Sequence, residues 1–190
     1  MNVIETAIPG MLIVEPKVFG DSRGFLTELY QADRYAVGGI DRRFVQDNFS
    51  RSVKGTLRGL HFQNPKLQGK LVTVLRGAVL DIAVDVRRGS PTFGRHVAVE
   101  LNDENRRQCW IPPGLAHGFF VKSDVADFFY KCDEFYSPAD EFALRWSDRT
   151  LGIDWGCDSP LLSPRDREAP GLAELHDVLP RFEPARCPAR

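Results

Sequence analysis

The stretch from Leu57 to Lys70, which reads LRGLHFQNPKLQGK, carries the side chains best suited to chemistry. It combines a cation (Arg58), a histidine (His61), an amide (Gln63) and a second cation (Lys70) with apolar neighbours. The β-prone run LVTVL follows directly, so the stretch is expected to pass through the body of the domain. Polar groups of these types in such a place indicate a site for acid/base chemistry.

Arg58 and His61 are three residues apart, and in a regular strand they would point to opposite faces. Gly59 lies between them, and a glycine lowers the cost of irregular backbone. We therefore predict a bulge at Gly59 that turns Arg58 and His61 to one side of the strand.

A second histidine, His117, lies where the turn PPGL leads into a strand-like run. Small neighbours, Ala116 and Gly118, leave room around its ring. Two histidines on strands beside cations and carboxylates favour a shared site over two separate core positions. We predict that His61 and His117 belong to one site.

The run 78–86 has one wholly apolar face, and its other face carries Asp81 and Asp85. Two interpretations remain open from the residues alone. The aspartates lie in water on the wet side of an antiparallel sheet, or they lie inside a hollow barrel. In the second case the apolar face would pack against another sheet or subunit.

Short strand-like runs bounded by Gly, Pro, Asn and Asp fill the chain up to about residue 146. Eight to twelve such strands, without a helix of normal length between them, predict an all-β sandwich or barrel. The strands are expected at 11–18, 24–30, 44–50, within 57–75, and at 78–86, 95–101, 107–111, 116–122, 126–133 and 141–146. Short helices are expected at 31–37 and 171–178. The chain is expected to form one domain, residues 1–190, with a core over about 1–170 and an irregular C-terminal tail over about 171–190. The Pro- and Gly-rich chain after Trp146 is expected to wrap the barrel.

The charge balance restricts the partners of the chain. Its 25 Lys and Arg against 26 Asp and Glu give a net charge of −1. The chain therefore lacks the excess of positive charge that is typical of proteins that bind nucleic acid or an anionic membrane. An anionic ligand must then be held by a local group of cations.

The sequence shows no signal peptide. It also has no apolar run near the roughly 20 residues that span a membrane, so a cytoplasmic protein is expected. The cysteines, which form no CxxC pair, are expected to be reduced thiols: Cys109, Cys132, Cys157 and Cys187.

A metal centre is the main alternative use of the histidines. Metal-binding barrels of the cupin type usually carry a His-x-His pair, and here that position reads His61–Phe62–Gln63. With His61 and His117 as the only plausible nitrogen ligands, the usual three-histidine-plus-acid set cannot be assembled. We predict acid/base chemistry without a metal or another cofactor.

Eight motifs follow one another over about residues 1–170: DSRGFLTE (21–28), QDN (46–48), LRGLHFQ (57–63), QGK (68–70), DIAVDVRRGSPTFG (81–94), WIPPGLAHGF (110–119), YKCDEFYSPADE (130–141) and LSPRD (162–166). In these motifs and their order the chain resembles the dTDP-4-dehydrorhamnose 3,5-epimerase family. The resemblance implies a cupin fold, that is, a double-stranded β-helix jelly-roll barrel. It also implies the substrate dTDP-4-keto-6-deoxy-D-glucose, whose C3 and C5 hydrogens are acidified by the C4 ketone.

The resemblance assigns catalytic roles to four residues. His61 would remove the proton, oriented by Asp166, and Lys70 would stabilise the enolate. Tyr130 would return a proton from the opposite face and so invert the carbon. From the residues alone, Tyr130 reads as a core aromatic and Asp166 as a turn or helix-cap residue.

The resemblance further implies how the substrate is held. His117 and Asp81 would form a second polar pair near the sugar, which favours a buried Asp81. Matching positions would hold the nucleotide, diphosphate or sugar: Arg23, Glu28, Gln46, Asn48, Arg58 and Glu141. Aromatic residues would line the site or stack on the thymine: Phe25, Phe119, Phe135 and Tyr136. Phe135 stands where some members have tyrosine, which keeps an aromatic surface and removes one hydroxyl.

The family forms a homodimer with exchanged strands, in which each site takes parts from the partner. Such a partner would also account for the apolar face of the run 78–86. Three alternatives remain open: an epimerase acting at C3 or C5 alone, a non-catalytic barrel that binds nucleotide sugars, and a metal-dependent cupin oxygenase or isomerase. The same catalytic residues would serve the single-centre enzyme, so the sequence does not separate it from the double epimerase.

Overall fold

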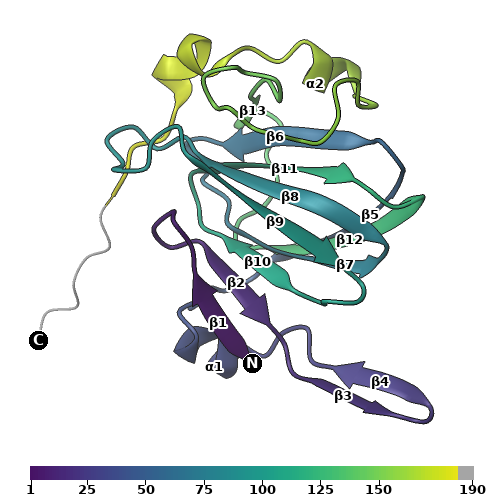
Figure 1. The fold of residues 1–190 in the computed structure, drawn as a ribbon. Helices are drawn as coiled ribbons and strands as arrows, with labels where there is room; N and C mark the ends of the chain where they lie inside the picture. Colours follow the sequence, from purple (N-terminus) through teal and green to yellow (C-terminus); the bar gives the residue numbers. More distant parts are fainter. Residues whose placement is uncertain (184–190) are drawn as a thin grey trace, which may run out of the picture.

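Two facing antiparallel sheets form a barrel in the computed structural model, which describes residues 1–183 (Figure 1). One sheet has the order β1 (Asn2–Glu5), β2 (Leu12–Glu15), β10 (Gln108–Ile111), β7 (Lys70–Arg76), β12 (Val125–Cys132) and β5 (Gln46–Val53). The other has the order β13 (Glu141–Ala143), β6 (Leu57–Gln63), β11 (Leu115–Val121), β8 (Ala78–Asp85) and β9 (His96–Asn102). A separate hairpin of β3 (Val18–Asp21) and β4 (Gly24–Thr27) projects from the barrel. The all-β jelly-roll prediction is confirmed.

Most predicted strands are present with ends shifted by one or two residues. The strand predicted over 11–18 is wrong, because β2 ends at Glu15 and β3 begins only at Val18. Pro16 lies in the gap, and a proline has no N–H to donate to a strand partner. Three other strands end three residues away from the prediction. β4 ends at Thr27 in place of 30, β5 ends at Val53 in place of 50, and β13 ends at Ala143 in place of 146. The strand β1 was not predicted.

Helices are short and lie at the periphery. The predicted helix is present as α1 (Ala32–Val37), and the Gln31 side chain caps it by accepting a hydrogen bond from Arg34 N. A 3-10 helix covers Leu172–Val178, and the unpredicted α2 (Pro164–Arg167) begins after Ser163, whose hydroxyl accepts from Asp166 N. No helix within residues 1–183 is long and apolar enough to cross a membrane.

The inner face of β8 decides between the two interpretations of its aspartates. Asp81 and Asp85 have no exposed surface, so the barrel interpretation is right and the wet-face interpretation is wrong. Asp85 accepts hydrogen bonds from Arg87, Ser90 and Thr92, which compensate the burial of its charge. Apolar side chains fill the interior around them: Val72, Val74, Val79, Ala83, Val99, Leu101, Phe119 and Phe128.

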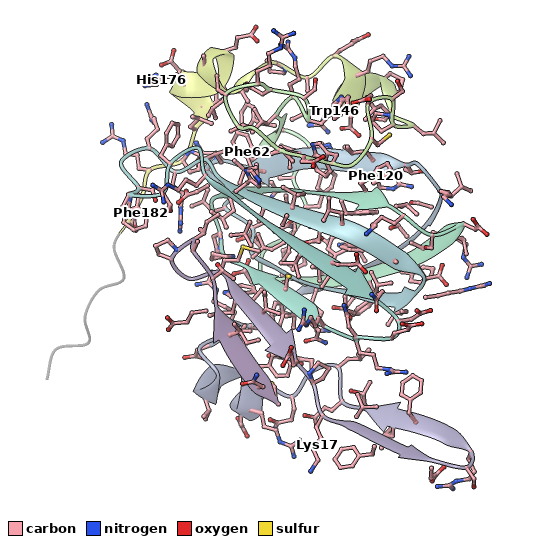
Figure 2. The ribbon with its side chains drawn as sticks, viewed as in Figure 1. Lys17, Phe62, Phe120, Trp146, His176 and Phe182 are labelled. Carbon is pink, nitrogen blue, oxygen red and sulfur yellow. The ribbon has the colours of Figure 1, made fainter. Side chains whose placement is uncertain are left out.

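The outer face of β8 is covered by the C-terminal part of the same chain. Ile82 and Val84 belong to one buried cluster with Trp155, Leu175 and Leu179. Figure 2 shows Phe62, Phe120 and Trp146 on this side of the barrel, and Figure 1 shows the C-terminal segment lying over β6. The prediction that a partner subunit accounts for this face is therefore wrong. The tail wraps the barrel as expected up to residue 183, and the rest of the predicted tail, 184–190, lies outside the described residues.

An irregularity in β6 lies where the sequence predicts it. His61 pairs with His117, whereas Arg58 pairs with Phe119, so β6 has one residue more than β11 between the two pairs. The extra residue interrupts the alternation of side chains. As a result, Arg58 and His61 line the same cavity.

Gly59 is the residue that permits this irregularity. Its φ of +121° disfavours any residue with a side chain. A Cβ built on Gly59 would also lie 2.5 Å from Gly118 Cα and 2.7 Å from His117 O, so β11 leaves no room for one. Both the backbone angle and the close approach of β6 and β11 therefore require glycine here.

We predict that Gly59→Ala lowers the free energy of unfolding by about 2 to 3 kcal/mol, because β6 and β11 must separate to admit the methyl group. Equilibrium urea denaturation measures this change. Gly89→Ala is the matched control, since Gly89 has a φ of +83° but no atom within 4 Å of the added Cβ, and it should lose only about 1 kcal/mol. Equal losses in the two variants would contradict the close-approach explanation.

Candidate active site

A cavity of about 260 Å³ opens between the two sheets of the barrel. Its lining comes from β5, β6, β7, β11, β12 and α2. The lining residues are Ser50, Arg58, His61, Lys70, His117, Phe119, Phe128, Tyr130, Ser163 and Asp166. The structure thus brings together all four predicted catalytic residues and three of the predicted binding residues.

His61 and Asp166 form the pair that faces this cavity from the β6 side. Their Nε2 and Oδ1 atoms are 2.6 Å apart, although the residues are 105 positions apart in the chain. Burial favours the neutral form of Asp166, but hydrogen bonds from His61, Ser163 and the Gly59 backbone outweigh it and hold the carboxyl pKa below its usual value. Asp166 is therefore an ionised acceptor that fixes the orientation of the His61 ring. No protein group within residues 1–183 hydrogen-bonds the other ring nitrogen, Nδ1.

Tyr130 and Lys70 enter the cavity from neighbouring strands of the six-stranded sheet. Burial, with smaller contributions from Cys132 and Glu141, raises the pKa of Tyr130 to about 12. The phenol therefore keeps its proton at neutral pH and can donate it. Burial lowers the pKa of the Lys70 ammonium, and the nearby Cys132, Glu141 and Asp81 oppose that change.

His117 and Asp81 form a second pair deeper in the barrel. Their Nε2 and Oδ2 atoms are 2.7 Å apart, and both side chains are buried. Phe128 stacks on Phe119 with ring centroids 4.1 Å apart, and the His117 ring lies beside Phe128. The other oxygen of Asp81, Oδ1, is buried without a hydrogen-bond partner among the described residues.

Arg58 is the cation that lines the exposed part of the cavity. Its Nε donates to the Ser52 hydroxyl at 3.0 Å, and Ser52 is buried. The terminal guanidinium nitrogens make no hydrogen bond to a protein group within residues 1–183 and can bind an anion in bidentate fashion.

Five other predicted binding residues lie near one another but outside the lining of this cavity. Gln46 on β5 accepts from Tyr136 N and donates to Asn48. The Tyr136 hydroxyl donates to Glu141, which also accepts from Arg165. The Phe135 and Tyr136 side chains, 60% and 48% exposed, lie in the segment between β12 and β13.

The remaining predicted binding residues, Arg23, Phe25 and Glu28, are not brought to the cavity by a single chain. Arg23 pairs with Asp21 in the projecting hairpin, and Glu28 pairs with Arg34 of α1. Phe25 is 59% exposed near the tip of the hairpin. Figure 1 shows this hairpin pointing away from the barrel.

The sequence interpretation missed several residues of the site. Ser50 and Ser52 share the strand face of Gln46 and Asn48. Because Gln46 and Asn48 are predicted binding residues, the alternation in the run 44–50 could have identified Ser50 as a residue of the site. Phe128 lies two residues before Tyr130 and could have been found in the same way. Nothing in the sequence pattern indicated the contact of Arg165 with Glu141.

Within residues 1–183, no three His, Cys, Asp or Glu side chains lie close enough together to form a metal site. Cys109, Cys132 and Cys157 are free thiols, and Cys187 lies outside the described residues.

The sequence of this chain matches a known protein family and relatives that belong to it. Residues 5–174 match the family described as dTDP-4-dehydrorhamnose 3,5-epimerase. The protein of that name from Shigella flexneri is 54% identical over 168 residues, which cover 87% of this chain and 93% of the relative. A dTDP-4-dehydrorhamnose 3-epimerase from Streptomyces niveus is 41% identical over 193 residues, which cover 100% and 92% of the two chains.

A solved structure has the same fold as this chain. The dTDP-6-deoxy-D-glucose-3,5-epimerase of Legionella pneumophila, crystallised in complex with dTDP-4-keto-L-rhamnose, matches with a TM-score of 0.93. It is 53% identical, and the match covers 96% of this chain and 99% of the solved one. The chain therefore belongs to the dTDP-4-dehydrorhamnose 3,5-epimerase family, a family of isomerases with the cupin jelly-roll fold.

Proposed function

We propose that this protein epimerises dTDP-4-keto-6-deoxy-D-glucose at C3 and C5 and so forms dTDP-4-keto-L-rhamnose. One observation carries the proposal. The His61–Asp166 pair and the Tyr130 phenol enter one cavity from different sheets, as a base and an acid must when they act on opposite faces of a sugar ring. The 3,5-epimerase relatives support the choice of substrate.

The first step is removal of a proton beside the C4 ketone. His61 takes this proton, and the buried Asp166 carboxylate stabilises the imidazolium that forms. Asp166 is well suited to this role because its pKa lies below the usual value and it remains an anion. The ring orientation that Asp166 imposes also reduces the motion needed at the moment of transfer.

The electrons of the broken C–H bond move to the C4 oxygen and form an enolate. Lys70 lines the same cavity and supplies positive charge to this oxygen. Because the negative charge is nearly absent from the ketone, the attraction stabilises the transition state more than the substrate. His117, held by Asp81, contacts the sugar from the inner end of the cavity.

The last step returns a proton to the carbon from the other face. Tyr130 is the donor, since its pKa of about 12 leaves the phenol protonated at neutral pH. Loss of the hydrogen on the His61 side and gain of one on the Tyr130 side invert the carbon. The reaction is redox-neutral, so the proposal includes no electron-transfer cofactor.

The nucleotide and diphosphate lie along the mouth of the cavity. A volume of about 260 Å³ suits the sugar ring but is below the roughly 300–1,000 Å³ of pockets that enclose larger ligands. Arg58 binds the diphosphate, and the exposed rings of Phe135 and Tyr136 stack on the thymine. A few local cations of this kind explain how a chain of net charge −1 holds a dianion.

A cytoplasmic location fits the free thiols Cys109, Cys132 and Cys157.

The projecting hairpin supports assembly into a homodimer. Three large apolar residues of this one hairpin, Phe19, Phe25 and Leu26, are 54%, 59% and 72% exposed, which suits a contact with a partner, and the Arg106 guanidinium lies over the Phe25 ring, 4.0 Å from its centroid. The hairpin also carries Arg23, which is away from the cavity of its own chain. We propose that the hairpin of each subunit completes the cavity mouth of the other.

An epimerase that acts at C3 alone is the second candidate. A 3-epimerase is 41% identical over the full chain, which is less than the 54% and 53% of two 3,5-epimerases, and the same base, acid and cation would serve it. The two candidates differ in whether C5, in addition to C3, is presented to His61 and Tyr130.

Hydrogen exchange followed by proton NMR tests the function. With the purified protein and dTDP-4-keto-6-deoxyglucose in deuterated water, deuterium should enter at both C3 and C5. His61→Ala should slow this exchange at least about 100-fold, whereas His176→Ala, which changes an exposed histidine outside the site, should match the wild type. Exchange at C3 alone would support the second candidate, and none at either carbon would refute both.

A heterodimer tests the shared site. One subunit carries Arg23→Ala and Phe25→Ala, and the other carries His61→Ala; different affinity tags allow the mixed species to be purified after co-expression. The cavity of the first subunit then receives an intact hairpin from the second, so about half of the wild-type activity should return per dimer. Each variant homodimer serves as the inactive control. A heterodimer no more active than these controls would exclude a hairpin lent by the partner.

A further inference from the structure

The segment 133–140, which joins β12 to β13, carries the two exposed rings proposed to meet the nucleotide. No strand pairing holds this segment, because the ladder of β12 ends at Cys132 and that of β13 begins at Glu141. Backbone bonds at its two ends and the side chains of Gln46, Gln63 and Gln68 hold its backbone instead, and Gln63 is the buried one of the three. These bonds hold the loop by its backbone, so the exposed side chains of the loop stay free to contact a ligand.

Gln63, at the end of β6, makes the central contacts. Its Nε2 donates to Lys66 O at 2.9 Å and to Phe135 O at 3.3 Å, and its Oε1 accepts from Ser137 N at 2.9 Å. The side chain is only 5% exposed and does not line the cavity. The amide nitrogen and the amide oxygen are therefore both bonded within the protein, away from the cavity.

Three further contacts extend this anchoring along the same backbone. Gln68 Nε2 donates to Glu134 O at 2.7 Å, and Gly69 N donates to the Asp133 carboxylate. Tyr136 N donates to Gln46 Oε1 at 2.9 Å. Each residue from 133 to 137 thus has at least one backbone or side-chain bond to another part of the chain.

We propose that Gln63 is a positioning residue for nucleotide recognition, which holds the backbone of residues 135–137 so that the Phe135 and Tyr136 rings are presented before the ligand arrives. The inference rests on the proposed function, in which these rings stack on thymine. Prior ordering of a loop lowers the entropy lost on binding. Since Gln63 touches neither the cavity nor the reacting atoms, its loss should weaken binding and leave the chemical step nearly intact.

The same arrangement explains why position 63 holds an amide. A side chain here must accept from one backbone N–H and donate to two carbonyl groups, and only the amide of glutamine or asparagine offers both functions in one planar group. Asparagine is one methylene shorter. Without the amide, the Phe135 carbonyl and the Ser137 N–H lose their partners beneath the loop, at a cost to its ordered state.

The test compares Gln63→Met with the wild type and with Gln108→Met. Methionine keeps the length of the side chain and removes every hydrogen bond. Gln108 is the matched control because it is equally buried and bonds Tyr35 and Leu29 away from the segment. Gln68→Met is a second variant, which removes one anchor and disturbs the barrel less.

Two readouts are needed. Hydrogen–deuterium exchange with mass spectrometry on peptides covering 133–141 reports the order of the segment. Titration with dTDP and steady-state kinetics report binding and turnover.

In Gln63→Met we expect faster exchange in these peptides, a Kd for dTDP and a KM about tenfold higher, and a kcat within about threefold of the wild type. Gln68→Met should change the same quantities in the same direction by less, and Gln108→Met should leave the exchange of these peptides unchanged. Unaltered exchange in the segment, or a fall in kcat with unchanged KM and Kd, would overturn the proposal. If the wild type itself did not turn over the substrate, the proposed function would fail, while exchange and dTDP titration would still decide the role of Gln63.

Discussion

The close approach of β6 and β11 at Gly59 and Gly118 is the constraint on which the site depends. A Cβ on Gly59 would lie 2.5 Å from Gly118 Cα, and one on Gly118 would lie 2.7 Å from Arg58 O. This contact accompanies the extra residue in β6 that turns Arg58 and His61 into one cavity. It also leaves the Gly59 N–H in position to donate to Asp166. Arg58 and His61, the proposed phosphate-binding cation and base, therefore depend on the same local backbone.

The barrel holds three carboxyl groups in its interior, and each of the three has a specific partner. Asp166 has His61, Asp81 has His117, and Asp85 has Arg87. Unpaired charge in such surroundings would be strongly destabilising, so these pairs are a condition of the fold as well as of the chemistry. The same burial raises the pKa of Tyr130 and lowers that of Lys70. A site on a solvent-exposed sheet face would have neither effect.

Much of the fold and part of the site follow from local sequence patterns. Alternation of side chains predicted most strands, and the spacing of Arg58 and His61 around Gly59 predicted the bulge. Alternation could not decide whether Asp81 is buried, because a wet sheet face and a barrel interior give the same pattern. The residues alone read Asp166 as a cap, since its partner His61 is 105 positions away. Likewise, the cover of the outer face of β8 depends on where the tail returns, and local periodicity carries no information about that.

The central claim is that His61 and Tyr130 act on opposite faces of the same carbon. The most direct measurement follows Tyr130→Phe with dTDP-4-keto-6-deoxyglucose in deuterated water, recording deuterium uptake and sugar configuration separately by NMR. We predict that deuterium still enters, because His61 can remove a proton and return a deuteron on its own face, while inversion is lost. Inversion at a rate near that of the wild type would contradict it, since the second face would then need no Tyr130 proton.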